Sequence, residues 1–110
     1  MPGMLRLSIT TERRPMRIAP VHPGRVLKRE LTTRDLSANR LALALRLPSG
    51  RITDILNGKR GISPDTALRL GRYFGNSARF WLNLQTAYEL ALAEKEIGAQ
   101  IASEVKPDAA

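Results

Sequence analysis

The chain has 110 residues, with 18 Lys and Arg against 10 Asp and Glu, a formal net charge of +8 and a sequence pI near 11.1. This length suits one domain, no apolar run reaches the roughly 18 residues of a spanning helix, and the start lacks a signal-peptide core, so we expect a cytoplasmic protein without membrane contact. Because cysteine is absent and His22 is the single histidine, we expect no cofactor, no metal site and no enzymatic activity.

The charge is unevenly distributed along the chain. Residues 1–80 carry 16 basic and 5 acidic side chains, whereas residues 81–110 carry 2 basic and 5 acidic ones. Such a basic region favours a polyanion as partner, with a merely solubilising surface as the alternative. Arginine supplies 14 of the 18 positive charges, and its planar fork suits phosphates and guanine edges. These arginines include Arg25, Arg29, Arg34, Arg40, Arg46, Arg51 and Arg60.

Residues 1–20 mix Thr, Arg, Pro and Met without a sustained period, and we interpret them as a flexible basic arm. Leu5 to Ile9 alternates apolar and polar side chains like an edge strand, although a lone strand needs a partner. The pair Arg13 and Arg14 is open to two interpretations, insertion into a minor groove and a solvated tail, of which the second is simpler.

Helical patterns begin at His22-Pro23-Gly24, because proline suits a first helical position and apolar residues then recur at helical spacing as far as Leu31. We interpret His22 as a helix-start residue rather than a switch or ligand. Ser37 is expected to cap a second helix of about two turns that ends before Pro48.

Three further helices follow. We expect Ser49 to cap a helix over Gly50–Asn57, with Ile52, Ile55 and Leu56 facing inward and Arg51, Thr53 and Asp54 facing outward. The next helix has Ser63 as cap, Pro64 at its first position and Gly75 at its end.

The last predicted helix starts from Ser77, and Gly98 is expected to weaken or end it. Its aromatic residues Phe80, Trp81 and Tyr88 suit core or dimer packing better than a stacking platform for single strands. The expected fold is an all-α five-helix bundle with a long C-terminal helix. Residues 21–97 form the domain and its packing or dimerisation helix, and residues 98–110 form a partly helical or disordered tail.

Two short helices joined by a tight link, followed by a basic loop, predict a DNA-binding helix-turn-helix. Ala42 is small where the two helices cross, and the start of the second helix is free of bulky side chains that would block a major groove. Asp54 either accepts from a cytosine amino group or pairs with Arg51 or Arg60. The candidate DNA-binding residues are Ala38, Arg40, Ser49, Gly50, Arg51, Thr53, Asp54, Asn57, Lys59 and Arg60.

The residues Ser37 to Gly58 resemble the lambda-repressor-like (Xre) helix-turn-helix. Together with the opening His22-Pro23-Gly24, the "NGKRGIS" loop and "FWLNLQ", the run from Met16 to Leu92 resembles the HigA-type antitoxins of toxin–antitoxin pairs. The resemblance implies a dimer that binds an inverted-repeat DNA operator, represses its own operon and neutralises a small basic HigB (RelE-like) toxin that cleaves mRNA. For that toxin, the acidic C-terminal helix is a candidate surface.

One position departs from the family pattern. The family has glycine at the end of the second helix, where the turn can need positive φ, and this chain has Arg46. Either Arg46 adopts the left-handed region at a cost on the order of 1 kcal/mol, or the turn is built differently.

Three other functions compete with the antitoxin. They are a stand-alone repressor without a toxin, a protein-interaction module with an acidic partner, and a nuclease, for which the scattered carboxylates are unsuited.

Overall fold

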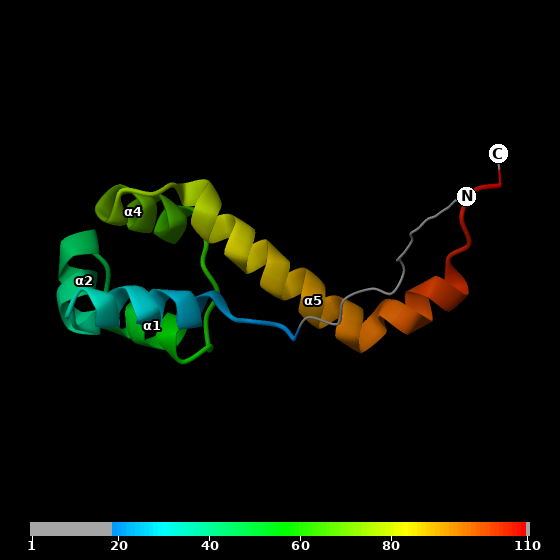
Figure 1. The fold of residues 1–110 in the computed structure, drawn as a ribbon, viewed down its shortest axis with the longest axis horizontal. Helices are drawn as coiled ribbons and strands as arrows, with labels where there is room; N and C mark the ends of the chain where they lie inside the picture. Colours follow the sequence, from blue (N-terminus) through cyan, green and yellow to red (C-terminus); the bar gives the residue numbers. More distant parts are fainter. Residues whose placement is uncertain (1–18, 110) are drawn as a thin grey trace, which may run out of the picture.

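The computed structural model describes residues 19–109, and within them the chain forms five α-helices and no strand. The expected all-α fold is therefore confirmed. Figure 1 shows α1 to α4 gathered into one body, while α5 starts on this body and then runs away from it. The helices are α1 (Pro23–Thr33), α2 (Ala38–Leu45), α3 (Ser49–Leu56), α4 (Pro64–Phe74) and α5 (Ala78–Glu104).

One hydrophobic core holds the helices together, with contributions from all five helices and from the loop before α4. Trp81 is its largest member, and its indole N–H donates to Asn76 Oδ1 at 3.0 Å, so the buried ring has its polar group satisfied. The interpretation of Trp81 as a core residue is confirmed. The buried core side chains are Leu27, Leu31, Leu41, Ala42, Leu45, Ile52, Ile55, Ile62, Ala67, Leu70 and Trp81.

Three serines begin three of the helices, as the sequence predicts. The hydroxyl oxygens of Ser37, Ser63 and Ser77 each accept the backbone N–H three residues later, at 3.1, 3.3 and 3.1 Å. Each bond satisfies one of the N–H groups that the first turn of a helix leaves without an intrahelical partner. The starts of α2, α4 and α5 are therefore fixed by local side chains.

The start of α3 differs from the prediction. Pro48 is its N-cap, Ser49 is its first residue rather than its cap, and its end is Leu56, with Asn57 as C-cap. Pro48 has φ −61° and ψ 141°, the extended backbone of an N-cap, which its ring already favours, and its carbonyl accepts the N–H of Arg51 at 3.0 Å. Proline therefore sets the start without a side-chain hydrogen bond.

The expectation that Gly98 weakens or ends the last helix is wrong for its end, since α5 continues to Glu104. One glycine costs a helix only about 1 kcal/mol, which a 27-residue helix tolerates. The outer part of α5 changes direction where it has left the body (Figure 1). Residues 105–109 form no regular structure.

The predicted basic arm lies almost entirely outside the described residues, and so do the strand-like Leu5 to Ile9 and the pair Arg13 and Arg14. Within residues 19–109, every helix falls short of the length and apolarity that a bilayer crossing requires.

Candidate nucleic-acid interface

The turn between α2 and α3 is built around Arg46. This residue has φ 61° and ψ 43°, so the left-handed alternative is the one the chain adopts. Arg46 N–H donates to the Leu43 carbonyl at 3.2 Å and Leu47 N–H to the Ala42 carbonyl at 2.9 Å, the two bonds of a Schellman motif. These bonds offset the cost of roughly 1 kcal/mol for a side chain in this region. The turn thus keeps the geometry that glycine would give, and the Arg46 side chain is exposed.

The helix α3 is held by one face and exposed on the other. Ile52 and Ile55 are completely buried, and Ala42 of α2 is buried where the two helices pack. Thr53 and Asn57 are exposed on the opposite face, and no packing within the described residues covers them. The predicted inward and outward faces are confirmed for Ile52, Ile55 and Thr53. Leu56, predicted inward, and Arg51 and Asp54, predicted outward, are each only half-buried.

Gly50 has no steric role within the protein. A Cβ placed on Gly50 would meet no atom within 4 Å, and its φ is not positive. Glycine nevertheless costs a helix roughly 0.5–1 kcal/mol relative to alanine. Its exposed position beside Ser49 leaves the first turn of α3 narrow and open, which suits close approach of another molecule.

Polar and basic groups flank α3 on both sides. Arg40 is exposed in the first turn of α2, where Ala38 is half-buried against the core. Lys59 and Arg60 are exposed in the loop after α3, and their backbone N–H groups donate to the Asp54 carbonyl at 2.8 and 3.2 Å. The start of α2, the helix α3 and this loop thus carry all ten sequence-predicted DNA-binding residues, of which Ala38, Arg51 and Asp54 are half-buried and the other seven are exposed.

Asp54 was expected either to accept from a cytosine amino group or to form an ion pair with Arg51 or Arg60. The structure distinguishes these by whether the ion pair is present. Within residues 19–109 the carboxylates that form salt bridges are those of Glu30 and Asp65, and neither partner is Arg51 or Arg60. The local ion pair is therefore not formed. The half-buried Asp54 side chain keeps its acceptor oxygens for another donor.

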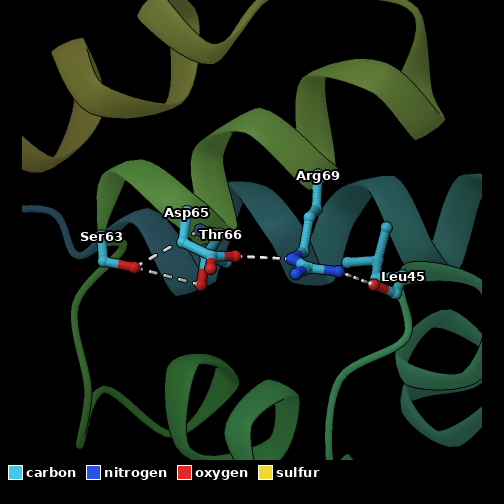
Figure 2. A network of polar contacts seen from close by, with 5 residues as sticks. All are labelled: Leu45, Ser63, Asp65, Thr66 and Arg69. Atoms are coloured by element: carbon cyan, nitrogen blue, oxygen red, sulfur yellow. Dashed lines mark hydrogen bonds and ion pairs between the residues drawn. The ribbon is translucent and has the colours of Figure 1, made fainter.

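Arg69 ties α4 to the end of α2 (Figure 2). Its Nε donates to Asp65 Oδ1 at 2.5 Å, and its Nη1 donates to the Leu45 carbonyl at 2.9 Å. Leu45 directly precedes Arg46 at the end of α2, so Arg69 satisfies a backbone carbonyl that has no partner within the helix. The hydrogen bond from Arg69 holds the pKa of Asp65 below its ordinary value, and the positive charge of Arg51 lowers it further. This role of Arg69 was not predicted, although Asp65 and Arg69 have the four-residue spacing of a helical ion pair.

Arg34 is exposed like the cations above, but its side chain has partners within the protein. It forms a salt bridge with Glu30, and its guanidinium lies over the Phe74 ring, 4.7 Å from the centroid. Arg69 therefore helps hold the fold, whereas the exposed pair of Arg34 and Glu30 is a surface contact that contributes little to stability.

His22 begins α1 as predicted, with its Nδ1 accepting the N–H of Gly24 at 2.9 Å. Its ring meets that of Tyr88 edge-on, with centroids 4.9 Å apart. Gly24 is required for close packing, because a Cβ there would lie 2.0 Å from the carbonyl oxygen of Ile55. Burial lowers the pKa of His22, against a smaller opposing effect of a hydrogen bond to the Arg60 backbone. His22-Pro23-Gly24 therefore places α1 against the end of α3.

The described residues hold no group of three or more His, Asp or Glu side chains arranged for a metal ion. The chemistry of this surface is that of hydrogen bonding and charge. Its donors and acceptors are the side chains of Arg40, Arg51, Thr53, Asp54, Asn57, Lys59 and Arg60.

Comparisons with known proteins agree with this geometry. A model of the helix-turn-helix family matches residues 27–81. Virulence-associated protein I of Dichelobacter nodosus is 52% identical over 77 residues, which cover 69% of this chain and 71% of that protein. The structure of an addiction module antidote protein of the HigA family from Coxiella burnetii matches with a TM-score of 0.81 at 50% identity, over 83% of this chain and 100% of that one. Pseudomonas aeruginosa antitoxin HigA, solved with the higBA promoter, matches with a TM-score of 0.78 at 48% identity, over 80% and 97% of the two chains.

Proposed function

The chain belongs to the helix-turn-helix family, among the HigA-type antitoxins, and from this membership we propose that it represses its own operon and neutralises a HigB-type mRNA-cleaving toxin. In this role it acts by binding alone, in the cytoplasm, where the operator and the toxin both lie. The proposal has two halves, DNA recognition and toxin neutralisation, which rest on different parts of the molecule.

The observation that carries the DNA-binding half is the uncovered outer face of α3 between two basic flanks. Gly50, Thr53 and Asn57 are exposed on that face, and Lys59 and Arg60 follow it. In a major groove, Arg51, Thr53 and Asp54 reach base edges, and the two loop cations reach phosphates. Phosphate neutralisation then supplies much of the affinity and makes it fall with salt.

The outer half of α5 supports a homodimer. Its aliphatic side chains Leu90, Ile97 and Ile101 are between 45% and 61% exposed, and steps of seven and four residues place them on one face of the helix. Packing this face against a second copy removes it from water. A dimer in which the two α3 helices lie about one DNA turn apart reads an inverted repeat.

The toxin half rests on family membership and on charge. Glu94 and Glu96 are exposed on α5, whereas Glu89 accepts a hydrogen bond from Gln85. These carboxylates make the C-terminal part of the chain negatively charged, opposite to the charge of the DNA-binding surface. A negative surface is complementary to a basic partner.

Co-expression tests both halves. The small open reading frame beside this gene is expressed with and without the protein, growth is followed, and the purified protein or complex is titrated with the duplex of its own promoter. Growth arrest that the protein relieves, a stoichiometric complex and salt-dependent operator binding are expected. Operator binding without toxicity or a complex would leave a stand-alone repressor. No duplex binding at low salt would remove the DNA-binding half.

A further inference from the structure

The loop that carries Lys59 and Arg60 packs against α5 and hydrogen-bonds to it. We call residues 57–62 the phosphate loop. At its far end, the Ile62 N–H donates to Gln85 Oε1 at 2.8 Å. Gly61 lies directly against the same side chain, since a Cβ at Gly61 would be 2.7–2.9 Å from the Gln85 amide atoms. Gln85 therefore contacts the phosphate loop through both a hydrogen bond and close packing.

Gln85 is itself oriented by its helix. Its Nε2 donates to Glu89 Oε2, one turn further along α5, at 2.8 Å. With the amide nitrogen directed to Glu89, the amide oxygen is the atom presented to Ile62. Glu89 thereby selects the orientation in which Gln85 can hold the loop.

A second contact with α5 runs through His22. The His22 ring packs edge-on against Tyr88, three residues along α5 from Gln85. It also lies beside the phosphate loop, since a Cβ at Gly58 would be 4.0 Å from the His22 Cγ. His22 and Gln85 thus both lie against the phosphate loop and belong to contacts with adjacent turns of α5.

We propose that Gln85, oriented by Glu89, is a positioning residue for DNA binding: it fixes the phosphate loop in the conformation from which Lys59 and Arg60 contact the DNA backbone. Gln85 touches no DNA in this proposal, and its effect passes through the two cations. A loop that is already ordered before binding loses less conformational entropy when the DNA complex forms than a mobile loop does. The inference rests on the proposed function, and it makes the inner turns of α5 part of the DNA-binding machinery.

A double-mutant cycle tests this role with the full-length protein and the duplex of its own promoter. Gln85→Ala is expected to lower operator affinity about tenfold and to reduce the salt dependence of log K by about one. In a Lys59→Ala/Arg60→Ala background, the same change is expected to cost less than about twofold, because the groups that it positions are gone.

Gln100→Ala is the matched control. Gln100 Nε2 donates to Glu104 Oε2 on the same helix, so this change removes an equivalent pair far from the phosphate loop, and it is expected to leave affinity unchanged. Thermal unfolding of each variant verifies that it is folded. Gly61→Ala attacks the same contact from the loop side, because its methyl group displaces the Gln85 amide, and it is expected to reproduce the effect of Gln85→Ala.

The outcomes separate this inference from the proposed function. Wild-type protein that binds no duplex would overturn both. Wild-type binding with unchanged affinity in Gln85→Ala, or an equal loss in both backgrounds, would overturn the positioning role alone. If Gln85→Ala does not fold, Gly61→Ala in the two backgrounds decides by the same criteria.

Discussion

Within residues 19–109, no packing covers the outer face of α3 or the outer half of α5, but these two surfaces are chemically opposite. The first presents small and polar groups such as Gly50, Thr53 and Asn57 beside exposed cations. The second presents aliphatic side chains such as Ile97 and Ile101 among carboxylates. A polar, basic face binds a polyanion in a salt-dependent way, whereas an apolar face binds protein through burial. Under the proposed function, the first face binds DNA and the second binds a protein partner.

The largest expected effect comes from removing the apolar character of α5. Ile97→Glu together with Ile101→Glu places charges in the proposed dimer interface, where they cannot be buried without a large cost. We expect a monomer in analytical ultracentrifugation and a loss of operator affinity of about 100-fold or more, because one recognition helix then binds alone. Thermal stability measured at low concentration should change little, since both side chains are already exposed in the monomer.

Ala99→Glu is the control for this pair, because Ala99 is exposed on the opposite side of the same turn of α5. It should leave a dimer with wild-type affinity. A double variant that remains dimeric and binds the operator normally would contradict the assignment of α5 to self-association.

A smaller loss of operator affinity is expected when a single side chain of the proposed DNA-binding surface is removed. Its sequence dependence should distinguish base contacts from phosphate contacts. Arg51→Ala is expected to weaken operator binding by about 10- to 100-fold and a scrambled duplex much less, because a base contact is lost. Lys59→Ala should weaken both duplexes by a similar few-fold factor and lower the salt slope by about one, as loss of a phosphate contact does. Fluorescence anisotropy over a salt series measures both quantities.

The opposite pattern would break this division. If Lys59→Ala lost only the operator, Lys59 would read sequence rather than phosphate charge. Arg72→Ala is a suitable control, because Arg72 is an exposed arginine near the end of α4, outside the surface described above.

Gly50 separates function from stability within α3 itself. Gly50→Ala is expected to raise the free energy of unfolding by about 0.5–1 kcal/mol, because alanine favours the helix and its methyl group meets no atom of the protein. Gly50→Leu should remain folded but bind the operator more weakly, since the larger side chain occupies the narrow side of α3. Chemical denaturation and operator titration of both variants check the two parts. Tight operator binding by Gly50→Leu would show that this face does not enter a groove.

Much of the fold follows from local sequence signals. The N-caps of α2, α4 and α5 are recognisable in the sequence as Ser37, Ser63 and Ser77. The end of α4 is likewise marked by Gly75, which adopts the left-handed conformation. The start of α3 was wrongly predicted, because serine is a preferred N-cap residue, whereas here Pro48 takes that position without a side-chain hydrogen bond. Likewise, sequence alone offers two solutions for the turn at Arg46, and the Schellman bonds select one.

The outward face of α3 is predictable because it depends on spacing within a single helix. The contacts that hold this surface are not, because they join residues far apart in the chain. Arg69 bonds the carbonyl of Leu45, 24 residues earlier, and Gln85 accepts from Ile62, 23 residues earlier. A short motif such as "FWLNLQ" shows that Gln85 matters to the resemblance, but its partner becomes visible only when the helices are packed.

The smallest expected effect concerns His22, which touches both α5 and the phosphate loop and so links the two regions compared above. Burial lowers the pKa of His22 below its ordinary 6.5, so the folded protein favours the neutral ring. The neutral Nδ1 accepts from Gly24, and an imidazolium cannot do so. Below pH 6.5 the unfolded chain therefore binds the proton more readily than the folded one. The contribution of His22 to stability is thus complete above about pH 6.5 and declines as the pH falls through the window down to the folded pKa. Asp65, whose pKa is also lowered, loses its contribution to stability only in a more acidic window, below its ordinary pKa of 3.8.

Thermal unfolding at about pH 5 and about pH 7.5 should give a lower Tm at the acidic pH. His22→Asn, which keeps an N-cap acceptor but cannot titrate, should flatten this dependence. An equal slope in both proteins would place the titrating group elsewhere. A flattened slope would identify His22 as the group whose protonation lowers the stability of the fold.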